Sequence, residues 1–428
     1  MTGVLLLAAC RMSGGPDANA GAATTGSSEE TSSGTSTGVD THDAESSTAE
    51  DEADGSSGAA LQFTVTVEHG YGGGLFEPGD TVHVWAALDP ATQQVVQWTG
   101  DAVTVDDAGE WHTQFVMPAS DVELSAQLQP VDFAFSTTKF SGRDRGKTLR
   151  WFAPPQPRGM LLLFHGTGGS GAFVEKAEAG YIARLAAGRG LVVASLDAEE
   201  VDAGDLDGNG NLRWEVALSS DNVDFANVER AVAELHELAD LPKNAPVFAV
   251  GMSNGGAFSI ALGASGLLAG AAAYCADGTQ ASANATATPT AWFLCGNDPN
   301  EQVDNASAEA RHAMLLERGI PSEIHVHPSS PLYPERFARV DGIDIAESIG
   351  ITEELVAAGV VNEAGVFTVT GAELVALAQA EPEAFELLLG SAAQGGVLDQ
   401  IQIMMAEHKL YDDYAVRTLD FLLAQVEG

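Results

Sequence analysis

Apolar and polar residues alternate with a period of two in the segment that follows residue 60. The alternation is clear in Leu61–Val67, and Gly-rich turn segments such as Gly70–Gly74 separate the runs. This pattern is typical of half-buried strands joined by turns. The runs cover residues 61–67, 81–86, 95–98, 111–117 and 122–128. We therefore predict a small all-β module at residues 61–130.

A second pattern begins at about Lys147, where short apolar runs alternate with helix-like segments. Met160–Phe164 and Leu191–Leu196 are almost wholly apolar, as expected of parallel strands that are covered on both faces. The predicted strands are 149–153, 160–164, 191–196, 247–250, 269–274, 291–294 and 323–326, and the predicted helices are 173–187, 221–238, 301–318 and 412–425. Ser219 or Ser220 is the expected cap of the second helix. This succession predicts an α/β fold with a mostly parallel sheet, whose chemistry gathers at the carboxyl ends of the strands.

Residues 329–405 interrupt the alternation of strands and helices. Their helix-like stretches are 335–349, 352–358, 371–378, 383–389 and 397–406, and no further strand of the sheet is evident. We expect a helical insertion in a domain that covers residues 140–428, lying over the mouth of the active site. A small helical subdomain packed elsewhere is the alternative.

The composition excludes some classes of function. The chain has 428 residues, enough for two or three domains, and 45% of them are hydrophobic. The net charge of −42 argues against binding to nucleic acid and, by charge, to anionic membranes. Only five of the 19 basic residues are lysine, so the acidic surface suits a salty environment or ordinary solubility. No apolar run is long enough to span a bilayer.

Residues 1–10 predict a lipoprotein-type signal segment. Leu7-Ala-Ala-Cys10 resembles a bacterial lipobox, which implies that Cys10 carries a lipid and becomes the mature N-terminus. The apolar run Val4–Ala9 is short and no Lys or Arg precedes it, which a start codon assigned too far downstream would explain. Residues 11–60 predict a flexible acidic Ser/Thr/Gly linker. We expect an exported protein, either secreted or anchored to the outer membrane or cell surface; an arbitrary apolar N-terminus and a disordered tail are the alternative.

Three motifs in the β module resemble the divergent internalin-type B-repeat of bacterial surface proteins. They are Phe76-Glu-Pro-Gly-Asp-Thr-Val82, Trp98-Thr-Gly-Asp101 and Phe115-Val-Met-Pro-Ala-Ser-Asp-Val122. The resemblance implies a β-grasp-like fold with a surface or spacer role and brings no catalytic residue. The histidines of the module are scattered, and we expect them to be structural: His69, His83 and His112.

Ser253 is the strongest candidate for chemistry. The apolar run Val247–Val250 leads into Gly251-Met-Ser-Asn-Gly-Gly256, and a helix pattern of small residues follows. This is the strand–turn–helix context of a nucleophile elbow, where the tight turn requires glycine on both sides of the serine. The N–H groups of the following helix face a developing negative charge. A chance Gly-x-Ser-x-Gly in a chain with 47 glycines is the alternative.

A serine nucleophile needs a histidine base, which an acid orients. In the α/β-hydrolase arrangement these residues follow in the order serine, acid, histidine. His408 stands directly before the final predicted helix, where a base can reach the serine, and Tyr411–Asp413 can cap that helix. His327, at the end of the last predicted strand, is the second candidate for the base.

The acid is expected at the end of the strand 291–294. Asp298 follows this strand in a turn, in the sequence Gly296-Asn-Asp298. Asp277, at the end of the preceding strand, and Glu301 are the alternatives. A helix cap is the structural alternative for Asp298, because Asn-Asp-Pro often precedes a helix.

The oxyanion hole requires two backbone N–H donors. One is expected from Asn254, directly after the nucleophile, and the other from Thr167 in the loop His165-Gly-Thr-Gly-Gly169. Glycines in this loop let the backbone approach the substrate oxygen. His165 is expected to be structural, and a phosphate-binding role of the loop is weak because no Gly-Lys-Ser/Thr follows.

Three motifs together give a resemblance to a known branch of enzymes. They are His165-Gly-Thr-Gly168, Asp221-Asn-Val-Asp-Phe225 and Gly251-Met-Ser-Asn-Gly-Gly256. Residues 147–327 and 406–427 resemble the α/β-hydrolases that include polyhydroxybutyrate depolymerases and feruloyl esterases. This resemblance implies a Ser-Asp-His esterase without a cofactor, acting on a small or a polymeric ester. The chain departs from this pattern at Thr167, where depolymerases often have cysteine, and in the insertion. A peptidase or amidase and an inactive surface-binding protein are the alternatives.

A further loop resembles the start of an EF-hand calcium site. Oxygen-bearing side chains alternate in Asp205-Leu-Asp-Gly-Asn-Gly-Asn211, and glycine stands at the sharp turn. Glu215 comes one residue before the position that the motif requires. The candidate ligands of a structural calcium ion are Asp205, Asp207, Asn209, Asn211 and Glu215; an ordinary surface loop is the alternative.

Cys275 and Cys295 are candidates for a disulfide. Each follows or ends a predicted buried strand, and these two strands are expected to be neighbours in the sheet. An exported protein would oxidise such a pair. Two buried free thiols are the alternative.

Overall fold

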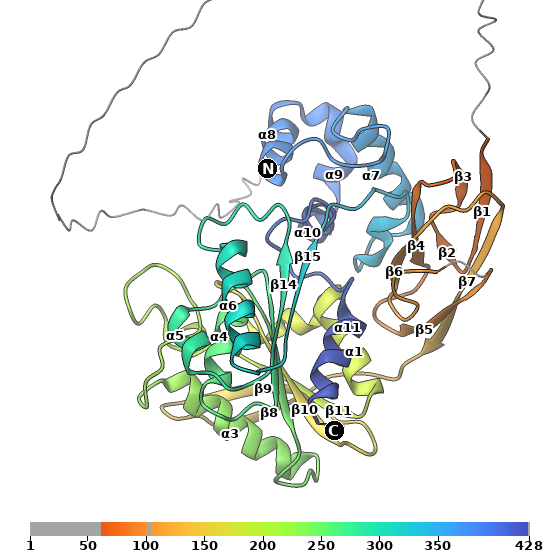
Figure 1. The fold of residues 1–428 in the computed structure, drawn as a ribbon. Coiled ribbons are helices and arrows are strands. Elements are labelled where there is room, and N and C mark those ends of the chain that lie inside the picture. Colours follow the sequence, from red (N-terminus) through yellow and green to blue (C-terminus); the bar gives the residue numbers. More distant parts are fainter. Residues whose placement is uncertain (1–60, 102–103, 427–428) are drawn as a thin grey trace, which may run out of the picture. The chain divides into compact units, whose positions relative to one another are not determined.

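The computed structural model describes residues 61–101 and 104–426, and Figure 1 shows how their helices and strands are arranged. The expected lipid attachment at Cys10 and the linker at residues 11–60 lie outside the described residues. In the part of the chain that is described, no helix has both the length and the apolar character needed to cross a membrane.

The predicted β module consists of seven strands in two sheets. The first sheet has the order β3-β1-β7-β5 and the second the order β2-β4-β6. The strands are β1 Phe63–Glu68, β2 Gly70–Tyr71, β3 Gly74–Phe76, β4 Thr81–Ala86, β5 Gln93–Gly100, β6 His112–Val116 and β7 Val122–Pro130. The residues described between 61 and 130 contain no helix, whereas a β-grasp fold packs one against its sheet.

An eight-stranded sheet forms the centre of the domain that follows. Its order is β8-β9-β11-β10-β12-β13-β14-β15. Only β9 runs opposite to the other strands, since both of its pairings are antiparallel. The strands are β8 Ser136–Ser141, β9 Gly146–Phe152, β10 Gly159–Phe164, β11 Leu191–Leu196, β12 Val247–Met252, β13 Gly270–Tyr274, β14 Thr290–Cys295 and β15 Ser322–His327. The prediction of a mostly parallel sheet is confirmed.

Helices cover both faces of this sheet. They are η1 Gly171–Glu175, α1 Ala177–Gly188, α2 Glu199–Ala203, α3 Val223–Leu238, α4 Asn254–Gly263, α5 Gln280–Ala285, α6 Asn305–Glu317 and α11 Ala415–Ala424. Successive residues of a strand point to opposite faces. Leu161 and Leu163 of β10 therefore join a core with α1 and α11. Met160 and Leu162 join a second core with α3 and α4.

The helical insertion lies between β15 and α11. It contains η2 Arg336–Arg339, α7 Ile345–Ala357, α8 Gly371–Ala380, η3 Pro382–Phe385, α9 Glu386–Gly390 and α10 Gln394–Met404. Apolar side chains such as Phe337, Ile351 and Leu388 give it a core of its own. In Figure 1 it lies beyond the carboxyl ends of β14 and β15, and α10 leads directly into the segment that carries His408.

One local prediction was wrong, and one strand was missed. The cap of α3 is Asn222, whose side-chain oxygen accepts a hydrogen bond from the N–H of Phe225 at 3.0 Å, and not Ser219 or Ser220. Strand β8 was not predicted, because Phe140 is its only apolar residue. This strand lies at the edge of the sheet, where one neighbour is enough and the apolar pattern of a central strand is not needed.

Candidate active site

Ser253 occupies the turn between β12 and α4. Its backbone has φ 55° and ψ −124°. Residues other than glycine rarely adopt this conformation, which a nucleophile elbow requires. A Cβ atom on Gly251 would lie 2.1 Å from the carbonyl oxygen of Gly255. A Cβ atom on Gly255 would lie 2.4 Å from the carbonyl oxygen of Phe164. Both glycines of the motif are therefore required by the close approach of backbone atoms.

His408 reaches Ser253 from residues 405–414, which connect α10 to α11 and form the histidine connection. Its Nε2 atom lies 2.8 Å from the Oγ atom of Ser253. Asn297 holds this connection in place, because its backbone N–H donates to the carbonyl oxygen of Ala406 at 3.0 Å and its side chain donates to that of Met405 at 2.9 Å. The imidazole is thus within hydrogen-bond reach of the proton that a base must remove.

Asp298 lies behind the imidazole, in the turn after β14. Its Oδ2 atom lies 2.7 Å from Nδ1 of His408, and its Oδ1 atom accepts a hydrogen bond from the N–H of Asn300 at 2.8 Å. Because an ionised carboxylate only accepts, Nδ1 carries the proton and Nε2 is left to accept from Ser253. Asp298 is not a helix cap, since α6 begins at Asn305 with Asp304 as its cap. The structure thus brings the three predicted residues together.

The alternative residues lie elsewhere. The ring of His327 is buried and stacks on Tyr411 with the ring centroids 4.2 Å apart, and burial lowers the pKa of this histidine. Asp277 forms an ion pair with Arg311 at 2.6 Å. Glu301 is exposed.

The sheet order, the turn at Ser253 and the chain order Ser253, Asp298, His408 together identify the architecture. The chain has the α/β-hydrolase fold. No protein-family model and no curated protein sequence matches it.

Several solved structures are similar to it. The acylaminoacyl peptidase of Pyrococcus horikoshii is 11% identical, with a TM-score of 0.35, over 61% of this chain and 50% of that chain. The dienelactone hydrolase of Anabaena variabilis is 18% identical, with a TM-score of 0.35, over 46% of this chain and 87% of that chain. A carboxyl esterase of Bacillus coagulans is 13% identical, with a TM-score of 0.35, over 46% of this chain and 91% of that chain. The chain thus spans half the length of the peptidase, and likenesses this weak do not indicate a substrate.

The two predicted oxyanion donors belong to segments that adjoin Ser253. Asn254 is the first residue of α4, so its backbone N–H has no acceptor within the helix. A Cβ atom on Gly166 would lie 3.2 Å from Cβ of Ser253, so the loop after β10 lies against the serine. The next residue, Thr167, is exposed. The role of the Asn254 and Thr167 N–H groups as oxyanion donors stays a prediction, which these contacts support.

His165 shapes this loop as a neutral imidazole. Its Nδ1 lies 2.8 Å from the carbonyl oxygen of Gly166, and its Nε2 accepts a hydrogen bond from the N–H of Ala198 at 3.1 Å. Burial lowers the pKa of His165, which favours the neutral ring that can donate at one nitrogen and accept at the other. The expected structural role of His165 agrees with these contacts.

Residues 212–214, the Trp214 segment, contact the side chain of Asn254 and the loop that carries Thr167. These contacts were not predicted from the sequence. The Asn254 side chain accepts from the backbone N–H of Trp214 at 2.7 Å and donates to its carbonyl oxygen at 3.2 Å. Two residues earlier, the carbonyl oxygen of Leu212 accepts from the N–H of Gly168 at 2.8 Å. The Trp214 indole also donates to the carbonyl oxygen of His165 at 2.9 Å. A tryptophan in a loop of Asp, Asn and Gly was the only signal in the sequence that pointed to this segment.

Two of the predicted calcium ligands, Asp205 and Asp207, belong to one group of carboxylates. The carboxylates of Glu200, Asp205 and Asp207 lie within 4.8 Å of one another, whereas Glu215 is not among them. The carboxylate of Asp205 accepts hydrogen bonds from three backbone N–H groups of its own loop, among them that of Gly210 at 2.7 Å. The calcium site and its ligand set, with Glu215 included, stay a prediction.

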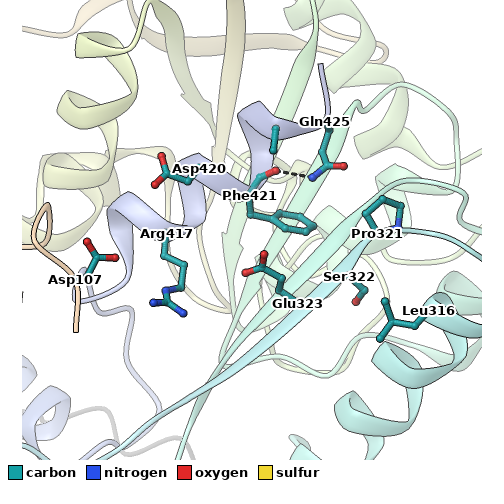
Figure 2. A pocket seen from close by; sticks show the side chains of 10 residues that line it. Asp107, Leu316, Pro321, Ser322, Glu323, Arg417, Asp420, Phe421 and Gln425 are labelled. Carbon is teal, nitrogen blue, oxygen red and sulfur yellow. Dashed lines mark hydrogen bonds between the residues drawn. The ribbon is translucent and has the colours of Figure 1, made fainter. Parts of the chain in front are cut away.

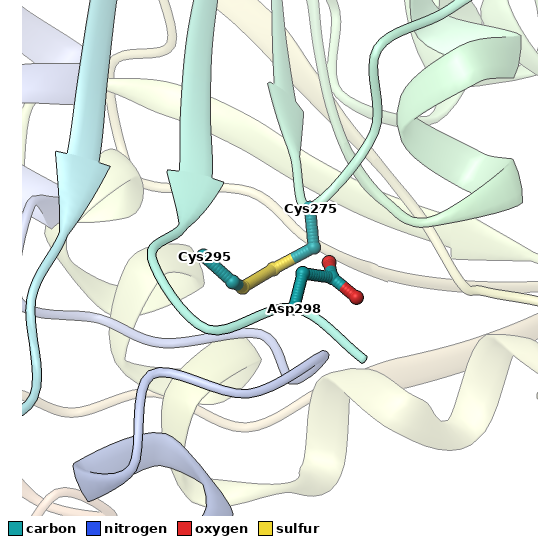
Figure 3. A group of neighbouring side chains, drawn as sticks. All are labelled: Cys275, Cys295 and Asp298. Atoms are coloured by element: carbon teal, nitrogen blue, oxygen red, sulfur yellow. A yellow bond between two sulfur atoms is a disulfide. The ribbon is translucent and has the colours of Figure 1, made fainter. Parts of the chain in front are cut away.

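Cys275 and Cys295 form a disulfide beside the acid (Figure 3). They follow β13 and end β14, which are paired neighbours in the sheet. Figure 3 also shows Asp298 close to the two sulfur atoms. The carbonyl oxygen of Lys409, the residue after His408, lies 3.1 Å from the sulfur of Cys275. The disulfide therefore adjoins both the turn that carries Asp298 and the histidine connection.

The protein also contains a hollow of about 560 Å³, which Figure 2 shows from close by. Its lining comes from α6, α11, the start of β15 and the β module: Asp107, Leu316, Pro321, Ser322, Glu323, Arg417, Asp420, Phe421, Ala424 and Gln425. Ser322 is the first residue of β15, whereas the triad stands at the carboxyl ends of the strands. The hollow is therefore not the place of the proposed chemistry.

Proposed function

We propose that this protein is a serine hydrolase that cleaves carboxylic esters. The observation that carries the proposal is the hydrogen-bonded series from Ser253 Oγ through His408 to Asp298, with distances of 2.8 and 2.7 Å. Nucleophile, base and orienting carboxylate are each within hydrogen-bond reach of the next, as nucleophilic catalysis requires. An inactive surface-binding protein has no need of this alignment.

In the first half of the proposed reaction, Ser253 Oγ attacks the ester carbonyl carbon while His408 Nε2 takes its proton. The resulting oxyanion accepts hydrogen bonds from the N–H groups of Thr167 and Asn254. His408 then gives the proton to the leaving alcohol, and the acyl group stays on Ser253. Asp298 stabilises the imidazolium that forms between the two proton transfers.

In the second half, water replaces the alcohol. His408 removes a proton from the water, whose oxygen attacks the acyl-enzyme carbonyl, and the same N–H groups stabilise the second oxyanion. Collapse returns the proton to Ser253 Oγ and releases the carboxylic acid. Apart from the water molecule, these steps use groups of the chain, and that no cofactor is required stays a prediction.

The substrate class and the location rest on the sequence. The motif around Ser253 resembles those of polyhydroxybutyrate depolymerases and feruloyl esterases, which favours an ester that is large or polymeric. The lipobox-like Cys10 favours an exported, lipid-anchored protein. A disulfide between Cys275 and Cys295 supports an oxidising compartment.

A labelling experiment followed by a substrate panel tests this proposal. We expect a fluorophosphonate probe to label the wild type but not Ser253→Ala. His408→Ala should lower kcat by roughly 10³-fold or more, because only the oxyanion hole and substrate binding remain. His327→Ala is the matched control and should cost far less.

The panel contains p-nitrophenyl esters of increasing acyl length, feruloyl esters, polyhydroxybutyrate and matching anilides. Turnover of esters faster than anilides supports the esterase, and the reverse supports a peptidase or amidase. If the wild type is neither labelled nor active, the chain is not a hydrolase. If His327→Ala abolishes turnover and His408→Ala does not, the assignment of the base is wrong.

A further inference from the structure

The β module and the hydrolase domain share one hydrophobic core. Trp98 and Met117 of the module belong to the same buried cluster as Tyr181 of α1 and Leu419 of α11. A spacer that merely precedes an enzyme would have a core of its own. Contacts across this boundary are therefore part of the domain that carries the triad.

Glu110 of the module supplies a cap for α11. This helix has no side-chain cap of its own, so the expected capping by Tyr411–Asp413 was wrong. The buried Glu110 accepts a hydrogen bond through Oε1 from the N–H of Arg417 at 3.0 Å. Burial raises the pKa of Glu110 well above its usual range, and a neutral carboxyl group still accepts through one oxygen. The first turn of the helix that follows His408 is thus completed from the module.

Trp111, the next residue, contacts the insertion. The guanidinium carbon of Arg339 lies 3.6 Å from the centroid of the Trp111 ring, and that of Arg336 lies 5.1 Å from it. Arg339 also donates a hydrogen bond to the Oδ2 atom of Asp412 at 2.5 Å. All four residues are buried, and a cation over an indole ring is held more strongly when water is excluded. Trp111 therefore packs against the ion pair that ties η2 to the histidine connection.

His112, the third residue in succession, binds that connection directly. Its Nδ1 atom lies 2.5 Å from the Oδ1 atom of Asp413. On its other side, Nε2 of His112 lies 3.0 Å from Nδ1 of His83. Burial, with the neighbouring His112, lowers the pKa of His83 to about 4. The neutral His83 ring can therefore donate to His112, which in turn donates to Asp413.

We propose that Glu110, Trp111 and His112 are positioning residues for His408. They hold, in order, the start of α11, the Arg339–Asp412 pair and Asp413. Asp412 and Asp413 follow His408 by only four and five residues in the sequence. The β module thereby completes the catalytic unit, an inference that rests on the proposed function.

The need for this support follows from where His408 stands in the chain. The helical insertion separates it from β15, the last strand of the sheet. On the sheet side the connection is fixed by Asn297 and by Tyr411, whose hydroxyl donates to the carbonyl oxygen of Leu294 at 2.9 Å. The contacts of the β module fix the same connection from its other side, at Asp413 directly and at Asp412 through Arg339. A displacement of about 1 Å in a catalytic group can cost roughly 100-fold in rate.

Three full-length variants test the inference. His112→Ala removes the bond to Asp413, and His112→Asn keeps a donor near the position of Nδ1. His69→Asn, which removes an exposed histidine of the same module, is the matched control. We expect His112→Ala to lower kcat and the rate of fluorophosphonate labelling by roughly tenfold or more while KM changes less than twofold. His112→Asn should recover most of the loss, and His69→Asn should behave as the wild type.

The measurements are made well below the melting temperature, so that a merely structural role leaves kcat unchanged. A His112→Ala variant with a lower melting temperature but wild-type kcat overturns the inference and leaves the proposed function intact. An inactive and unlabelled wild type instead overturns the proposed function. If His112→Ala does not fold, Trp111→Phe, which holds a cation less strongly, gives the same test. A kcat at least threefold lower with unchanged KM supports the inference, and wild-type kcat refutes it.

Discussion

Replacing the side chain of Asn254 tests directly how the proposed oxyanion hole is held in place. Asn254→Ala keeps the backbone N–H that donates to the oxyanion and removes only the amide. The amide makes two hydrogen bonds to the backbone of Trp214, at 2.7 and 3.2 Å. Through Leu212, the same segment accepts the N–H of Gly168, which adjoins the second donor. The substitution therefore releases the link between both sides of the hole without deleting either donor.

The size of the effect follows from the bonds that are lost. A hydrogen bond contributes about 1 kcal/mol net, so losing two costs about 2 kcal/mol, or roughly 30-fold in rate if the loss falls wholly on the transition state. Deleting an oxyanion donor outright costs roughly 10²–10³ in kcat, which sets the upper bound. We expect Asn254→Ala to lower kcat by roughly 10- to 100-fold and to change KM less than threefold.

The assay is steady-state hydrolysis of a p-nitrophenyl ester over a range of concentrations. Gln280→Ala is the control, because Gln280 is likewise the first residue of a helix and its amide is exposed. Wild-type kcat in Asn254→Ala would show that the Trp214 segment does not hold the donors. A large increase in KM with unchanged kcat would mean that the amide binds substrate.

Two further predictions concern stability. Burial raises the pKa of Asp224 to about 6 from 3.8, although it accepts hydrogen bonds from the N–H groups of Glu199 and Glu215. The folded state then holds a proton that the unfolded state has lost, so this group's contribution to stability falls as pH rises from about 4 through 6, by roughly 3 kcal/mol. Urea unfolding of the wild type and Asp224→Asn at pH 4 and pH 7 checks this. If the wild type gains stability relative to the variant between pH 4 and pH 7, the reasoning is refuted. The Cys275–Cys295 disulfide closes a separation of 20 residues, so replacing both cysteines by serine should lower the free energy of unfolding by about 3 kcal/mol. Two alkylated thiols in the non-reduced protein, found by mass spectrometry, would contradict the disulfide itself.

The positions of the three triad residues were predictable because each stands at the end of a patterned element. Ser253 follows the apolar run of β12, Asp298 follows that of β14, and His408 precedes the amphipathic α11. The choice between His408 and His327 was open in the sequence, since it depends on how the insertion returns the chain to the sheet. The structure separates them by their surroundings: His327 is buried against Tyr411, while His408 meets Ser253.

The Trp214 segment shows why other parts of the site were not predictable. Asn254 was expected to act through its backbone N–H, and nothing in the sequence indicates that its amide also binds the backbone of a residue 40 positions earlier. Hydrogen bonds between a side chain and a distant backbone leave no periodic pattern. The same holds for the calcium-like loop, where the carboxylate of Glu200 in α2 lies near those of Asp205 and Asp207.

The junction between module and hydrolase is the clearest case of tertiary structure overriding local pattern. Glu110, Asp412 and Asp413 are charged residues in short polar stretches, which predict exposure, and yet all three are buried. Burying a charge is costly unless it is paired or neutralised. Here Asp413 meets His112, 301 positions away in the sequence, and Asp412 meets Arg339. A local sequence pattern contains only one residue of each pair. The sequence therefore suggests that the module is a separate domain. Because the partners lie on three different segments, loss of any one leaves a buried polar group without its partner near His408, which is why we expect the module to affect kcat as well as stability.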